Sequence, residues 1–117
     1  MKINNIIFIL TVCFLPGIVS ANNLSFLKDS AVSYFTDKDT DLMWGNTMNT
    51  LDHYSDGKKS FWKNSQSGAW GYAIPSDTTK IKGTTCRHIK IFNESHHRTG
   101  ESNYTFCKIN GKWKIPD

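Results

Sequence analysis

Residues 83–87 (GTTCR) and 106–113 (FCKINGKW) decide the fold of this chain, because each holds one cysteine in a segment with the composition of a β-strand. Opposed residues of an antiparallel hairpin have position numbers with a constant sum, so pairing Cys86 with Cys107 fixes the register. Opposed Cα atoms lie about 4.5–5.5 Å apart, within reach of a disulfide. The two segments therefore predict a hairpin closed by a Cys86–Cys107 disulfide.

This register also predicts which face of the hairpin is buried. It sets Arg87 opposite Phe106 and Ile89 opposite Tyr104, so most large apolar groups of the hairpin lie on the face opposite the cysteines. The disulfide is then expected on the more polar face, beside His88.

A helix is expected before the strands, over residues 37–54. Thr36 opens the sequence TDKD, which resembles a capping box with Asp in place of Glu, and residues 55–57 (SDG) form a stop signal. A stripe of apolar and small residues at helical spacing predicts a face that packs on a sheet: Trp44, Thr47, Met48, Leu51 and Tyr54.

After Gly57 the pattern changes to short aromatic runs separated by turn residues, which is typical of strands. Pro75 either ends the second strand or places it at an edge, and Asn110-Gly111 is a strong hairpin turn. The predicted strands cover residues 60–63, 69–74, 84–92, 101–109 and 112–115, with loops through residue 82 and over 93–100. The expected fold class is α+β: an N-terminal helix packed on a small antiparallel β-meander of four to five strands with one disulfide.

The first residues have the pattern of a secretory signal peptide. A single basic residue precedes an apolar run, and small residues at 19–21 precede a cleavage site predicted between Ala21 and Asn22. A retained membrane helix and a lipoprotein acylated at Cys13 are the alternatives. The expected organisation is a signal peptide over 1–21, a docking arm over 22–36 and an α+β domain over 37–117.

Composition favours an exported, disulfide-bonded protein and argues against a nucleic-acid-binding one. The full chain has a formal net charge of +4 and three cysteines, and cleavage would leave the even pair Cys86 and Cys107. An even count suits an oxidising compartment, where small domains gain stability from disulfides. The lysines are scattered rather than gathered into a stripe, which argues against a nucleic-acid partner.

Candidate catalytic and metal-binding groups each have a simpler explanation. Cys86 and His88 resemble a nucleophile and base, but a disulfide-bonded cysteine is not a thiolate. His88, His96 and His97 lack the partners of a recognised zinc pattern, and the acidic residues within 37–41 lack the glycine and terminal glutamate of an EF-hand loop. We therefore expect no catalytic, cofactor-binding or metal-binding residues and no cofactor.

Four tryptophans offer another kind of site, because aromatic rings with interleaved polar groups bind sugars by stacking. In a domain of this size most of them are expected in the core. Trp62 or Trp70 is the better candidate for an exposed interaction surface.

Seven segments, in this order, carry a resemblance to a known family: 26–29 (FLKD), 34–39 (YFTDKD), 62–64 (WKN), 67–71 (SGAWG), 74–75 (IP), 83–87 (GTTCR) and 107–113 (CKINGKW). Together they resemble the bacterial 17 kDa surface antigen family, in particular its short proteobacterial proteins. The resemblance spans residues 24–115. The chain departs from the rickettsial antigens in lacking a good lipobox and a glycine-rich segment before the domain, which leaves membrane anchoring open.

The resemblance implies an exported, non-enzymatic protein of a Gram-negative cell envelope, in the periplasm or at the outer membrane or cell surface. It implies a structural or protein-interaction role, with an envelope protein or an outer-membrane assembly as partner and peripheral membrane association as an option. The alternative is a periplasmic or secreted module that binds glycan or peptidoglycan through exposed tryptophans.

Overall fold

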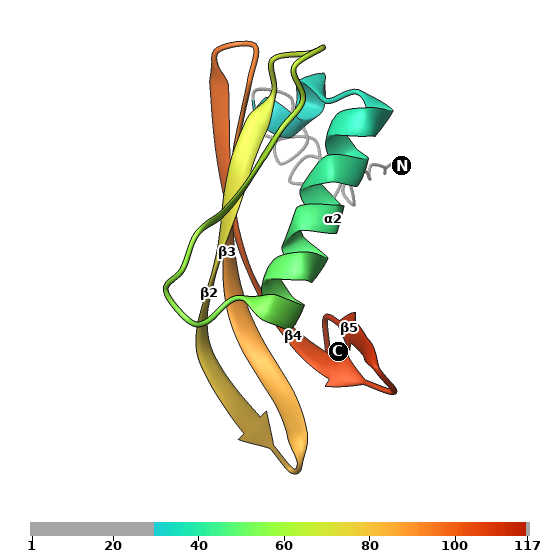
Figure 1. The fold of residues 1–117 in the computed structure, drawn as a ribbon, viewed down its shortest axis with the longest axis vertical. Helices are drawn as coiled ribbons and strands as arrows, with labels where there is room; N and C mark the ends of the chain where they lie inside the picture. Colours follow the sequence, from blue (N-terminus) through green and yellow to red (C-terminus); the bar gives the residue numbers. More distant parts are fainter. Residues whose placement is uncertain (1–29, 117) are drawn as a thin grey trace, which may run out of the picture.

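The structure is a computed structural model that describes residues 30–116, and in it one helix packs on a five-stranded antiparallel sheet (Figure 1). The strands lie in the sheet in the order in which they occur in the chain. The α+β meander predicted from the sequence is thereby confirmed. The elements are the 3-10 helix η3 (Ala31–Tyr34), the helix α2 (Asp37–His53) and the strands β1 (Ser60–Lys63), β2 (Trp70–Ile81), β3 (Thr84–Ser95), β4 (Arg98–Ile109) and β5 (Lys112–Lys114).

Helix α2 begins with the predicted capping box. The Asp39 backbone N–H donates to Thr36 Oγ1 at 3.1 Å, and the Thr36 backbone N–H donates to Asp39 Oδ2 at 2.9 Å. The buried Asp39 carboxylate also accepts hydrogen bonds from Asn64 and Ser67, which lie at the turn between β1 and β2. The capping box therefore satisfies N–H groups at the start of the helix, and its Asp39 also fixes the start of the helix against the sheet.

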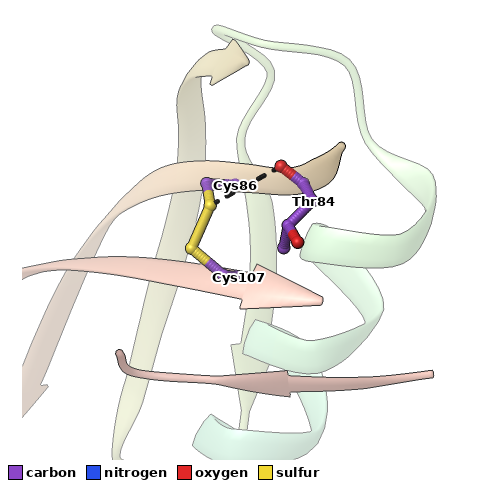
Figure 2. The surroundings of a disulfide bond; sticks show 3 residues. All are labelled: Thr84, Cys86 and Cys107. Carbon is purple, nitrogen blue, oxygen red and sulfur yellow. Dashed lines mark hydrogen bonds between the residues drawn. A yellow bond between two sulfur atoms is a disulfide. The ribbon is translucent and has the colours of Figure 1, made fainter. Parts of the chain in front are cut away.

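The register predicted for the central hairpin is confirmed pair by pair. Cys86 lies opposite Cys107, Arg87 opposite Phe106 and Ile89 opposite Tyr104. The disulfide bridges β3 and β4 with a Cα–Cα distance of 4.0 Å, and Cys86 Sγ lies 3.9 Å from the carbonyl oxygen of Thr84 (Figure 2).

The loops predicted around this hairpin are wrong, because the strands run further. Pro75 is expected from the sequence either to end the second strand or to lie at an edge. Strand β2 does not end there but continues to Ile81, with an irregularity between Ser76 and Thr79. Proline has no N–H to donate to a neighbouring strand. Pro75 is tolerated in β2 because β1 pairs with β2 only as far as Ala73, which leaves Pro75 at the edge of the sheet.

Each of the three hairpins that join β2 to β5 closes with a two-residue turn in which both residues have positive φ. Such turns match the twist of the flanking strands, and they favour glycine and asparagine. The expected turn Asn110-Gly111 is present, and the turns Lys82-Gly83 and His96-His97 replace the two predicted loops.

Helix α2 covers one face of the sheet, and the core lies between them. Thr47 and Leu51 of the predicted stripe are buried, whereas Trp44 lies at the rim against Tyr104. The β2–β3 hairpin extends beyond the end of the helix (Figure 1). The buried apolar cluster consists of Met43, Leu51, Trp62, Ala69, Ala73, Ile89, Ile91 and Phe106.

The N-terminal expectations fall mostly outside the described residues. This holds for the signal peptide, for its cleavage between Ala21 and Asn22 and for Cys13. Of the docking arm, η3 is described: Ala31 is fully buried, and the ring of Phe35 packs edge-on against Trp62. Within residues 30–116, no helix has the length and apolar character needed to cross a membrane.

Candidate functional site

The face of the sheet that α2 does not cover carries four aromatic side chains: Phe61, Trp70, Tyr72 and Phe92. We call this set the aromatic face. Its members come together because side chains alternate along a strand and the strands are in register, with Phe61 opposite Tyr72 and Tyr72 opposite Phe92. Three neighbouring strands thus contribute rings to one surface.

The four rings touch one another in sequence. Phe61 meets Tyr72 edge-on at 5.6 Å between centroids, Tyr72 stacks on Phe92 at 5.0 Å, and Phe92 contacts Trp70 at 5.5 Å. These spacings are those of favourable aromatic pairs, which hold the rings in defined orientations. The surface is therefore a preorganised arrangement of rings.

The aromatic face is open at the β1 edge. The side chain of Phe61 is 61% exposed, whereas Trp70, Tyr72 and Phe92 are half-buried. A pocket of about 400 Å³ lies beside it, lined by Phe61, Trp62, Lys63 and Trp70. Because Phe61 adjoins the other rings and the pocket, its exposure extends a contiguous apolar surface, and such surfaces mark interaction sites.

Lysines border the aromatic face on the β1 side. Lys59 places its ammonium 4.3 Å from the centroid of Tyr72, a cation–π contact, and Lys63 lines the pocket. Further along the sheet, Lys90 is paired with Glu101 at 3.8 Å, so its charge is partly compensated. The pocket end therefore combines apolar rings with positive charge, which suits a ligand that has both an apolar surface and an anionic group.

Of the two tryptophans considered for an exposed surface, Trp62 is the wrong one, because its side chain is buried. Its side chain is 7% exposed and points to the helix side, where Phe35 covers it, and only a part of it reaches the pocket. The reason is the strand period: Trp62 follows the outward Phe61 and so faces inward. Trp70 lies on the aromatic face, where its side chain is half-buried.

The other residues considered from the sequence take part in structural contacts. Cys86 is bonded to Cys107, and His88 lies 3.2 Å from Asn103 through its Nε2. His96 and His97 form a hairpin turn, in which His96 stacks on Tyr34. Across residues 30–116, the structure brings no three His, Cys, Asp or Glu side chains together in a group able to hold a metal ion.

A dense polar cluster lies where α2 ends. The Thr78 hydroxyl donates to Asp56 at 2.6 Å, and the Arg87 guanidinium donates to Asp56 at 2.8 Å. Hydrogen bonds from Thr78 and then from Arg87 lower the pKa of Asp56 from its ordinary 3.8 to about 2. The cluster joins the end of α2 to β2 through Thr78 and to β3 through Arg87.

Sequence reasoning missed Phe61, Tyr72 and Phe92 as site residues. The sequence of β2 alternates so that Trp70, Tyr72 and Ile74 share one face, but it does not show which residues of β1 and β3 lie opposite them. Only the register of β1 with β2 and of β2 with β3 brings the rings together.

Comparison with known proteins gives no guide to the role of the aromatic face, so that role is inferred from its geometry. No family model, no curated protein and no solved structure matches this chain.

Proposed function

We propose that this protein is a non-enzymatic, exported cell-envelope protein that acts by binding a protein partner through its aromatic face. One observation carries the proposal: four rings in mutual contact lie on the sheet face that α2 leaves uncovered, with Phe61 61% exposed at its edge. Exposed aromatic patches of this kind mark interaction sites, and aromatic residues dominate the energetics of protein interfaces.

The charges around the aromatic face indicate the chemistry of the partner. Lys59 and Lys63 flank Phe61 in sequence, and Lys63 lines the adjacent pocket. A segment that presents apolar side chains next to aspartate or glutamate would satisfy both features, since complementary charge steers association and fixes its register.

The setting proposed for this contact is the periplasm, outer membrane or cell surface of a Gram-negative bacterium. The Cys86–Cys107 disulfide supports an oxidising compartment, and the resemblance to the 17 kDa surface antigens supports the envelope. The partner would be an envelope protein or a component of an outer-membrane assembly.

Site-specific photocrosslinking tests the proposal. A photoreactive amino acid at Lys63, beside the pocket, is expected to give one discrete adduct in envelopes, and the same group at Lys82 in the β2–β3 turn is expected to give none. Phe61→Ser should reduce the adduct at least tenfold. Ile81→Ser is the matched control, because Ile81 is also a large apolar residue, is 55% exposed and lies at the opposite end of β2 from Trp70. Equal adducts with Phe61→Ser and the parent chain would contradict the proposal.

A second candidate function is binding of a glycan or peptidoglycan strand. The pocket favours it, since Phe61 and Trp70 offer ring faces for a sugar and Lys63 offers an ammonium for a carboxylate. Saturable quenching of tryptophan fluorescence by muropeptides, absent in Trp70→Ala and weaker with neutral chitin oligosaccharides, would favour this candidate over the protein partner. No quenching at millimolar muropeptide would exclude it.

A further inference from the structure

The short last strand β5 covers only the end of β4, so within residues 30–116 most of the outer side of β4 has no neighbouring strand. Strand β5 pairs with it only at Cys107, Lys108 and Ile109. Within residues 30–116, no strand pairs with the outer side of residues 98–106. Exposed edges of this kind are templates for pairing with another chain.

The disulfide shows which main-chain groups of β4 point outward. Its Cα–Cα distance of 4.0 Å marks Cys86 and Cys107 as a non-hydrogen-bonded pair of the β3–β4 ladder, because hydrogen-bonded pairs are about 5.5 Å apart. The register of β3 with β4 is unbroken, so the pattern alternates along the strand. The outward-pointing N–H and C=O groups are those of Thr99, Glu101, Asn103 and Thr105.

On the opposite side of the sheet, the part of β2 that extends beyond β1 is also an edge, but unlike β4 it is blocked. Where β2 extends beyond β1, Gly57 N–H donates to the Pro75 carbonyl at 2.7 Å and Thr78 N–H donates to the Asp56 carboxylate at 3.1 Å. The irregularity between Ser76 and Thr79 disrupts that edge further. Residues 98–106 (RTGESNYTF) have neither a proline, nor a lysine, nor a bulge.

We propose that β4 pairs with β4 of a second copy of this chain, antiparallel, about a two-fold axis at Ser102. This register sets Thr99 opposite Thr105 of the second copy and Glu101 opposite Asn103 of the second copy. Each of these opposed pairs exchanges two main-chain hydrogen bonds, so all outward groups of residues 99–105 find partners. Thr–Thr pairs across strands are favourable, and no like charges are opposed.

Neighbouring registers fit less well. An axis at Glu101 opposes the two Glu101 carboxylates, and like charges directly opposite destabilise a strand pair. An axis at Asn103 sets Thr99 opposite Cys107 of the second copy, whose main chain already pairs with Lys114 of β5. The axis at Ser102 alone uses the whole open stretch without displacing β5.

Pairing about this axis would enlarge the functional surface. A two-fold axis between antiparallel strands runs through the sheet, so the aromatic faces of both copies lie on the same side. The dimer would then present two aromatic faces to one partner surface, and two linked contacts bind more tightly than one.

Sedimentation velocity of the purified protein, with Asn103→Pro and Asn103→Thr in parallel, tests the pairing. The parent chain and Asn103→Thr are expected to be dimers. Asn103→Pro is expected to be a monomer with an unchanged circular dichroism spectrum, because the N–H at residue 103 points outward and no bond to β3 is lost. A dimer that persists in Asn103→Pro would overturn the proposal.

Ser102→Cys tests the register itself without weakening the strand. The axis sets this residue opposite its own copy in a non-hydrogen-bonded pair, the same geometry as Cys86–Cys107, so mild oxidation should give a covalent dimer through residue 102. Asn103→Cys is the control and should give at least tenfold less.

Hydrogen exchange distinguishes the remaining occupants of the edge. Protected amides at Thr99, Glu101, Asn103 and Thr105 in a dimer support the pairing. Protected amides in a monomer would show that residues before Ser30 cover the edge, and unprotected amides in a monomer would show an open edge. Either monomer result would overturn the proposal.

Discussion

The guanidinium of Arg87 lies 2.8 Å from the carboxylate of Asp56 and joins the middle of the sheet to the end of helix α2. The same guanidinium donates to the carbonyl oxygens of Leu51 and Tyr54, both at 2.7 Å. The last carbonyls of a helix have no partner within the helix, so a buried arginine on β3 serves as its C-terminal cap.

Replacing Arg87 should therefore loosen the helix from the sheet. We expect Arg87→Met to lower the free energy of unfolding by about 3 kcal/mol, because the buried helix carbonyls lose their donor. Arg87→Lys should recover less than half of this loss, since one ammonium cannot reach all the acceptors. Urea unfolding measures both, with the exposed Arg98→Met as control. Equal stabilities of Arg87→Met and Arg98→Met would refute the assignment.

Acid should destabilise the protein through Asp56. Its pKa is about 2 in the folded protein and near 3.8 in the unfolded chain, so the folded state binds fewer protons on this group. The stabilisation is complete above pH 3.8 and is lost as the pH falls toward 2. Hydrogen bonds from Trp113 and Lys108 lower the pKa of Asp52, which acts in the same direction.

Asp56→Asn should therefore be less stable than the parent chain at pH 6, with the difference shrinking between pH 4 and pH 2. Urea midpoints at several pH values measure this. Asp77→Asn, at an exposed position with positive φ that asparagine tolerates, is the control. A difference that stays constant with pH would argue against the Asp56 contribution.

Gly71 should be intolerant of any side chain. A Cβ at this position would lie 2.5 Å from Asn93 Oδ1 and 2.7 Å from Trp62 Nε1, and it would also clash with the Phe92 carbonyl oxygen. We expect Gly71→Ala to destabilise the protein by about 3 kcal/mol, since a backbone atom cannot move aside. Gly45→Ala, within α2 and with nothing nearby, should instead stabilise it by about 1 kcal/mol. Thermal unfolding of the two variants should shift in opposite directions.

The disulfide should contribute measurably to stability. Cys86 and Cys107 are 21 positions apart, and closing a loop of that length contributes about 3 kcal/mol in the chain-entropy model. Cys86→Ala with Cys107→Ala should lower the urea midpoint to that of the reduced parent protein, and reductant should have no further effect on the variant. If reductant does not change the urea midpoint of the parent protein, this expectation is wrong.

The central hairpin and the start of α2 were predictable because each depends on residues close in sequence or tied by chemistry. Cys86 and Cys107 fix a register that the whole β3–β4 ladder follows. Thr36 and Asp39 form their capping box within one helical turn. In both cases a few side chains impose geometry without help from the rest of the fold.

Strand ends were less predictable. Lys82 and His96 carry no turn signal, yet both adopt positive φ because the long strands on either side must be joined in two residues. The energy gained by extending the ladders outweighs the cost of placing these residues in the left-handed region.

The helix, the order of the strands, the disulfide and the register of the hairpin that it closes were all predictable from the amino-acid sequence. Three features depend on how the whole chain packs: Trp62 is buried, Phe61, Tyr72 and Phe92 join Trp70 on one surface, and the outer edge of β4 is open within the described residues. The difference lies in how many parts of the chain each feature depends on. Capping and disulfide pairing act between identifiable side chains, whereas exposure depends on how several strands and the helix pack together.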